Sequence, residues 1–154
     1  MGAAATDDER FEDFVGYITA LSREVQRIRA AESAKLGLQG ADIMVLHYLG
    51  HAQRGMTGSE LARAVGVSRA AVSRTLARME DEGLVEVSFG GADSTRYRAP
   101  VQLTEQGRVA SVEADKRISG VMDAVKGAQS NAERVQMYRS LQKVLACLET
   151  LARD

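Results

Sequence analysis

The sequence is poor in cysteine, in long apolar runs and in net charge, and each shortage excludes a class of protein. The only cysteine among the 154 residues is Cys147, so no disulfide can form within the chain, which suits a reducing compartment. No apolar run approaches the length that crosses a bilayer. The chain opens with small residues followed by Asp7, Asp8 and Glu9, where a secretory signal carries positive charge. We therefore expect a cytoplasmic protein without membrane contacts.

The net charge of −1 at pH 7 excludes attraction to nucleic acid by bulk charge, so any such contact needs a local basic patch. The hydrophobic fraction of 45% is sufficient for a core, and the charged fraction of 27% gives no sign of disorder. These values predict one folded domain with room for an extended appendage.

Both ends of the chain carry apolar residues at helical spacing. From about Asp8 to Lys35 they recur every three or four positions, which predicts one long amphipathic helix. After Glu105 the chain is predicted to be helical in two pieces, with a break near 127–131 and an apolar stripe over 135–151. A small central domain cannot cover both stripes, so they predict a dimer interface. The residues expected in this interface are Phe11, Phe14, Ile18, Leu141, Leu145 and Leu148.

The middle of the chain contains the signals of three shorter helices. Apolar residues lie nearly all around the segment 40–52, which predicts a core helix. Thr57 and Glu60 have the spacing of a capping box, so a short helix begins there. Ser68 can cap a further helix over 69–82.

A change of period after this helix predicts a β-hairpin. Gly83 stops the helix, and the segment 84–89 reads as a strand. A turn is expected at 90–93 and a returning strand over 96–103. Pro100 cannot donate to a ladder, so the second strand should lie at an edge or contain a break there.

The functional signal lies in residues 57–104. Ala62, Gly66 and Val72 have the spacing of a helix-turn-helix unit, because a small residue allows close approach, glycine permits the sharp turn and an apolar residue packs back. The second helix of such a unit enters the major groove. Four arginines and no acidic residue lie within 61–79, which is the expected electrostatic footprint in a chain of nearly zero charge.

The predicted DNA contacts lie on both helices of this unit and on the hairpin, or wing, which can follow the backbone or the minor groove. They are Thr57, Ser59, Ser68, Arg69, Ala70, Ser73, Arg74, Arg78, Arg96 and Arg98. A helix with arginines on one face is usually just a solvated surface. Taken alone, the arginine face would favour that interpretation over DNA binding. The joint occurrence of capped helix, turn, basic face, stop glycine and basic hairpin favours DNA binding.

The segment 49–107 resembles the multiple-antibiotic-resistance-regulator (MarR) family of bacterial winged-helix regulators. The resembling stretches are TGSELA at 57–62, VSRAAVSR at 67–74, LARMEDEGLV at 76–85 and VQLTEQG at 101–107. The helix order outside this segment also fits the family. Family wings commonly carry an Asp-x-Arg motif, whereas Asp93 and Arg96 are three apart here, so either Arg96 or Arg98 is the wing arginine.

The element order and this resemblance imply a mainly α fold with a small β-hairpin (α+β). A winged helix-turn-helix lobe at 36–104 would lie between an N-terminal dimerisation segment at 1–35 and C-terminal dimerisation helices at 105–154. The resemblance further implies a homodimer on a pseudo-palindromic operator in double-stranded DNA, with half-sites about 10 bp apart. It also implies a ligand-responsive repressor that binds a small aromatic or phenolic effector, with no enzymatic activity and no cofactor.

Three residues have an alternative interpretation as sensors. His47 and His51 lie at i and i+4, a spacing that can hold a metal. Glu32 or Asp42 would be a further ligand, but rings packed against a pocket or dimer wall are favoured, and no metal is expected. Cys147 as a redox sensor is disfavoured against a buried or interface cysteine.

Two further classes stay open. One is a winged-helix protein-interaction module without DNA binding, against which the four arginines of 61–79 and the two of the hairpin argue. The other is an enzyme with a helical pocket, but no catalytic triad pattern, phosphate-binding glycine loop or suitably placed carboxylate pair is present.

Overall fold

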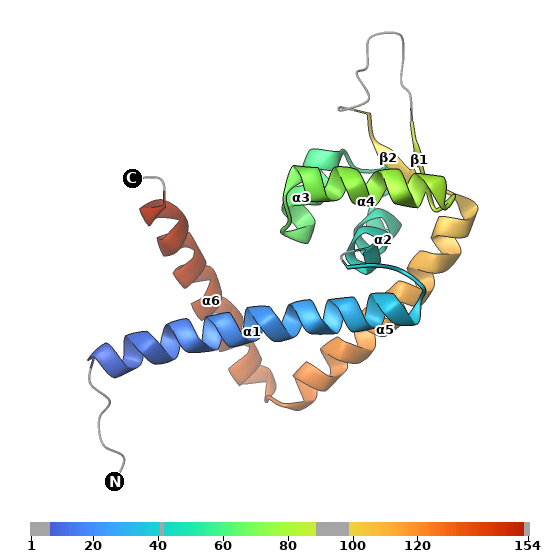
Figure 1. Ribbon diagram of the computed structural model, residues 1–154. Coiled ribbons are helices and arrows are strands. Elements are labelled where there is room, and N and C mark those ends of the chain that lie inside the picture. The colour runs from blue at the N-terminus through green and yellow to red at the C-terminus, as the bar shows by residue number, and fades with distance from the viewer. Residues whose placement is uncertain (1–6, 41, 89–98, 153–154) are drawn as a thin grey trace. The chain divides into compact units, whose positions relative to one another are not determined.

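Over residues 7–40, 42–88 and 99–152, which the computed structural model describes, the chain forms six helices and a two-stranded antiparallel sheet (Figure 1). The elements are α1 (Asp7–Lys35), α2 (Asp42–His51), α3 (Gly58–Val65), α4 (Arg69–Asp81), β1 (Val85–Val87), β2 (Val101–Leu103), α5 (Glu105–Gly127) and α6 (Asn131–Leu151). The predicted element order and fold class, mainly α with a small β-hairpin, are confirmed.

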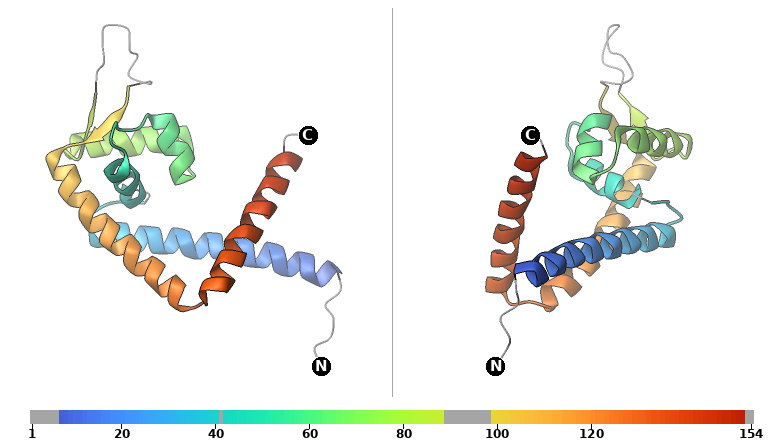
Figure 2. Two further views of the ribbon diagram at one scale, coloured as in Figure 1. Left: turned by 180° about the vertical axis from the view of Figure 1, so that it is seen from behind. Right: turned by 60° about the vertical axis from the view of Figure 1, so that its left-hand side comes forward.

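The chain divides into two compact units, Met1–Asp115 and Lys116–Asp154. The boundary lies within α5, which is one continuous helix (Figure 2). The second unit contains the end of α5 and the whole of α6, which a capping box of Ser130 and Glu133 begins. The division into dimerisation segments at 1–35 and 105–154 around a lobe at 36–104 stays a prediction. No helix of the described part is both long and apolar enough to cross a membrane.

The core of the first unit is built around α2, as its apolar sequence predicts. Ile43, Val45 and Leu46 are fully buried, and α2 packs against α1, α3 and β2. Leu61 of α3 and Met79 of α4 are also fully buried, so the helix-turn-helix unit contributes to the same core. Burying a side chain of this size stabilises the fold by about 1.5–3 kcal/mol.

Within the described residues, the paired strands cover less than the predicted ranges. β1 pairs with β2 from Val85 opposite Leu103 to Val87 opposite Val101. Leu84 does not extend β1, because its N–H donates to the Met79 carbonyl at 2.8 Å and closes the C-terminal turn of α4. Residues 89–98, which include the predicted turn and the wing residues Asp93, Arg96 and Arg98, lie outside the described residues.

Pro100 is accommodated because β2 begins at the next residue. Val101 then pairs on both sides, with β1 on one side and with Met56 on the other. The Met56 N–H donates to the Val101 carbonyl at 3.0 Å, and the Val101 N–H donates to the Met56 carbonyl at 2.8 Å. The Ser88 N–H donates to the Pro100 carbonyl at 2.9 Å, so Pro100 takes part in the pairing as an acceptor, and β2 is not an edge strand at Val101.

The start of α5 contacts the hairpin through a glycine. Gly107 is buried, and a Cβ atom added there would lie 1.9 Å from the Leu84 carbonyl oxygen. That oxygen also accepts the Thr104 N–H at 3.1 Å. Only a residue without a side chain allows α5 to approach the end of α4 this closely.

Candidate nucleic-acid interface

The first helix of the helix-turn-helix unit begins at the predicted capping box. The Thr57 N–H donates to Glu60 Oε2 at 2.7 Å, and the Glu60 N–H donates to Thr57 Oγ1 at 3.3 Å. Two hydrogen bonds from Thr57 lower the pKa of Glu60 below its ordinary value of 4.5. The larger effect comes from the Thr57 backbone N–H and the smaller one from its hydroxyl. Thr57 therefore organises α3, and a DNA contact from its side chain stays a prediction.

The turn between α3 and α4 has the predicted geometry. Gly66 adopts the left-handed conformation, with φ of 75°, and its N–H donates to the Ala62 carbonyl at 3.0 Å. Ala62 and Val72 are both buried where the two helices pack together. Ser68 caps α4 by accepting the Ala71 N–H at 3.1 Å.

Helix α4 has a buried and an exposed side. Val72 and Met79 are buried, and Thr75 and Leu76 are partly buried. The exposed residues of this helix include Arg69, Ala70, Ser73, Arg74 and Ala77, so four of the predicted DNA contacts lie on one accessible face. Small side chains on this face leave room for a close approach, and the two arginines supply its positive charge.

Arg78 is held differently from the other predicted contacts. Its Nη1 donates to Asp42 Oδ2 at 2.6 Å, and its Nη2 donates to Asp42 Oδ1 at 2.7 Å. The Asp42 side chain is fully buried, at 0% exposure, and its hydrogen bond raises the pKa of Arg78 above the ordinary value. Arg78 thus ties α4 to the first turn of α2. Its role as a DNA contact stays a prediction, and its place in the structure favours a role in the fold.

Three of the predicted contacts line one groove of about 430 Å³ between α3, α4 and the hairpin. Ser59 comes from the first turn of α3, and Arg69 and Ser73 come from α4. Arg74 lines a different hollow, together with Arg78. The accessible face of α4 therefore extends between two depressions, one on the hairpin side and one on the α2 side.

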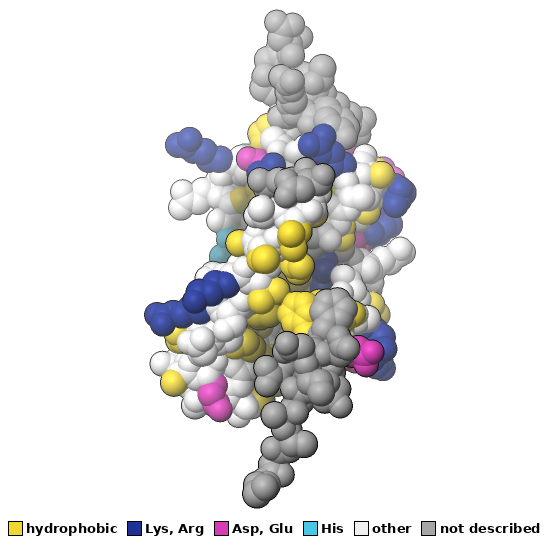
Figure 3. Space-filling model, turned by 90° about the vertical axis from the view of Figure 1, so that its left-hand side faces the viewer, with side chains coloured by type: hydrophobic (Ala, Val, Ile, Leu, Met, Phe, Trp, Pro, Cys, Tyr) yellow, Lys and Arg dark blue, Asp and Glu magenta, His cyan; other side chains and the backbone are white. Residues whose placement is uncertain are grey.

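The apolar stripes at the chain ends are exposed in the single chain. Phe14 and Ile18 of α1 are exposed, as are Leu141, Leu145 and Leu148 of α6. Leu145 is 58% exposed, and several such side chains along one helix mark an interaction surface. Figure 3 shows apolar side chains at the surface of one face of the chain. The side chain of Phe11 lies outside the described residues.

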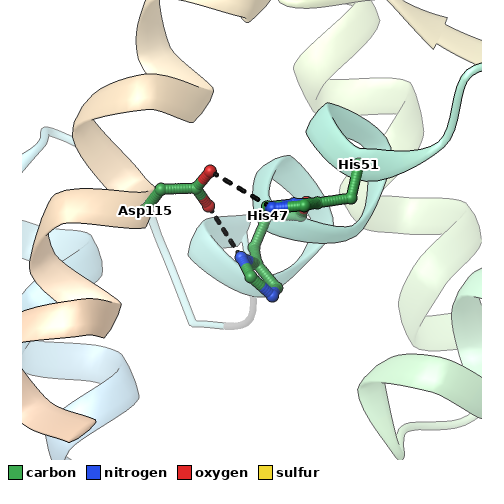
Figure 4. A group of neighbouring side chains, drawn as sticks. All are labelled: His47, His51 and Asp115. Carbon is green, nitrogen blue, oxygen red and sulfur yellow. Dashed lines mark hydrogen bonds and ion pairs between the residues drawn. The ribbon is translucent and has the colours of Figure 1, made fainter.

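The structure gives two acidic residues partners that the sequence did not indicate. Asp42, a candidate metal ligand from the sequence, is instead the buried partner of Arg78. His47 and His51 meet Asp115 of α5, which no sequence pattern connected to them (Figure 4). Cys147 is exposed in the single chain, so it is not buried within it, and an interface position stays a prediction.

Comparison with known proteins places this geometry in a family. Residues 36–94 match the model of the MarR family. The DNA complex of S. aureus MepR matches with a TM-score of 0.77 at 22% identity, over 88% of this chain and 97% of that one. The transcriptional regulator PA3341 matches with a TM-score of 0.73 at 27% identity, over 87% of this chain and 98% of that one. The MarR family transcription regulator SP03579 matches with a TM-score of 0.79 at 17% identity, over 96% of both chains. No curated protein matches the sequence.

The matched segment runs from the loop before α2 into the wing, so it contains the whole helix-turn-helix unit. The matching family and structures are those of transcription regulators, and they indicate no enzymatic family. The predicted resemblance to the MarR family is therefore confirmed: residues 36–94 match the family's model, and the chain has the fold of MarR-family transcription regulators.

Proposed function

We propose that the chain is a sequence-specific DNA-binding transcriptional regulator. The observation that carries this proposal is the face of α4, where Arg69, Ser73 and Arg74 are exposed on a helix whose other side is buried. No acidic residue lies within 61–79 to oppose a phosphate. A helix presented in this way by a helix-turn-helix unit fits the major groove. The MepR structure that this chain resembles is a DNA complex, which supports the same use of the fold.

A homodimer forms part of the proposal. The exposed apolar side chains of α1 and α6 need a cover, and a second copy of the chain would bury them. A two-fold dimer carries two copies of α4, so its operator would be a pseudo-palindrome with half-sites about one helical turn apart.

Regulation as a repressor released by a small aromatic or phenolic effector is the finer part of the proposal, and the family resemblance supports it. Such an effector acts only if it prefers one arrangement of the two recognition helices over another. A panel of such acids and phenols added to a preformed DNA complex should contain a compound that lowers the bound fraction.

The decisive experiment measures fluorescence anisotropy of DNA from upstream of the chain's own gene and of a scrambled duplex, at one fixed salt concentration. Selection from a random-sequence pool runs in parallel, so that a distant operator is not missed. We expect a strong preference for one sequence and an enriched pseudo-palindrome. Equal, weak binding to all DNA with no enriched motif would overturn the proposal and favour a protein-interaction module.

Arg74→Ala tests the reading face directly. If Arg74 contacts a base edge, the substitution should weaken binding to the preferred sequence by about 1–3 kcal/mol and leave binding to random DNA nearly unchanged. A phosphate contact would instead weaken both and reduce the slope of log affinity against log salt by about 0.9. Arg139→Ala, an exposed arginine of α6, is the matched control and should change neither. No effect of Arg74→Ala on either DNA would remove α4 from the interface.

A further inference from the structure

The two histidines of this chain meet one carboxylate. His47 and His51 lie one helical turn apart on α2, and Asp115 approaches them from α5 (Figure 4). His47 Nδ1 lies 2.7 Å from Asp115 Oδ1, and His51 Nε2 lies 3.8 Å from Asp115 Oδ2. Asp115 is 68 residues from His47 in sequence, so the fold brings these three side chains together. All three belong to the same compact unit.

The hydrogen bonding of His51 prepares one nitrogen for a cation. Its Nδ1 lies 2.8 Å from the His47 carbonyl oxygen, which can only accept, so Nδ1 carries the proton in the neutral ring. The lone pair of a neutral His51 is therefore on Nε2, the atom that faces the Asp115 carboxylate. Metal-binding histidines are commonly oriented by such a bond from the opposite ring nitrogen.

Two acceptors that face each other attract a cation into the gap between them. His51 Nε2 and Asp115 Oδ2 lie 3.8 Å apart, so one ion can approach both atoms. The gap between His47 Nδ1 and Asp115 Oδ1 holds a single proton, which a metal ion can replace. The chemistry of the three groups thus points to a cation that all of them share.

We propose that His47, His51 and Asp115 bind one divalent transition-metal ion, with Zn²⁺ as its representative. One ligand atom from each residue lies within 4.8 Å of the others. A tetrahedral site with bonds of about 2.0–2.2 Å brings its ligand atoms to within roughly 3.5 Å of each other, so the side chains need move by only about 1 Å. Two imidazoles and one carboxylate favour zinc, copper or nickel over magnesium or calcium.

The side chains of the His47, His51 and Asp115 cluster are partly exposed, so a metal ion can enter the site from solvent and leave it again. The side chains of His47, His51 and Asp115 are 29%, 63% and 36% exposed. A water molecule can therefore complete the coordination at the fourth position. The ion would link α2, the core helix of the lobe, to α5.

The test uses untagged, full-length protein freed of metal by a chelator, because a histidine tag would bind the same ions. Zn²⁺ binding is measured by competition with a chromophoric chelator, without DNA, so the result does not depend on the proposed function. We expect one ion per chain, and a loss of affinity of at least about tenfold in His47→Ala, His51→Ala and Asp115→Asn.

Two control variants separate this site from nonspecific binding. Asp123→Asn removes another carboxylate of α5, and Cys147→Ser removes the one thiol. Both should bind Zn²⁺ as the unchanged protein does. Binding that survives His51→Ala, or that disappears in Cys147→Ser, would overturn the proposal.

A second measurement covers the case in which a variant does not fold. Because the chain has only 2 histidines, NMR of the unchanged protein shows only two imidazoles. Zn²⁺ should shift the signals of both rings together, with saturation at one equivalent. Rings that do not respond to Zn²⁺ would refute the site without any variant.

Discussion

Replacing Arg78 with methionine should destabilise the folded protein, although its position on α4 suggests a DNA contact. The guanidinium makes two hydrogen bonds, at 2.6 and 2.7 Å, to the fully buried carboxylate of Asp42. Methionine keeps much of the packing volume but removes both donors. The donor that remains on this carboxylate in the described structure is the Gln39 backbone N–H, at 2.8 Å.

The expected loss of unfolding free energy is about 3–5 kcal/mol. Removing one partner of a buried ion pair typically costs about 3–5 kcal/mol, because a charge is left without compensation. Domains of this size are stable by only about 5–15 kcal/mol, so the loss is a large share.

Urea unfolding followed by circular dichroism measures the effect. All variants are compared at one protein concentration, because association would make stability depend on concentration. Arg74→Met, an exposed change on the same helix, should stay within about 0.5 kcal/mol of the unchanged protein. The double variant Asp42→Leu, Arg78→Met should recover most of the loss, since no charge remains buried. Unchanged stability of Arg78→Met, together with weaker DNA binding, would refute this reasoning and assign Arg78 to the interface.

Three other predictions test the packing, the assembly and the helix cap. Gly107→Ala should destabilise by about 1–3 kcal/mol in urea unfolding, because its methyl group would overlap the Leu84 carbonyl, whereas Gly120→Ala in the same helix should not destabilise; equal effects would contradict the close contact. Leu145→Asp should convert a dimer to monomers in analytical ultracentrifugation, and a monomeric unchanged protein would exclude the dimer. Because the pKa of Glu60 is lowered by folding, its stabilisation is complete above pH 4.5 and is lost as the pH falls through the lower value; Glu60→Gln should remove this dependence from acid unfolding curves, and identical curves would count against it.

Local signals predicted most of the fold. The capping box of Thr57 and Glu60, the turn at Gly66 and the stop at Gly83 act over a few residues, and each is found where its spacing indicates. The buried and exposed sides of α4 follow the helical period of its sequence. The strand ends were less predictable, because the Leu84 N–H donates to the Met79 carbonyl at the end of α4 and Leu84 is not part of β1.

The parts that sequence reasoning missed depend on distant partners. Asp42 and Arg78 are 36 residues apart, and their pairing is visible only once α2 and α4 are packed. The same holds for Asp115 and the two histidines of α2. Periodicity shows which side of a helix is apolar, but it does not show which charged group on another element a side chain will meet. An arginine on a basic helix therefore looks like a DNA contact until its partner is found.

The bridge between Met56 and Val101 has a consequence for how copies of the chain can aggregate. With β1 on one side and Met56 on the other, β2 offers no free edge at Val101 to a foreign strand. The open edge of the described sheet is that of β1, which is 3 residues long and carries the exposed Glu86. Short edges with a charge are poor templates for intermolecular strand pairing. Copies of this protein should therefore stay free of amyloid-like growth from the wing base, even at the high concentrations of overexpression.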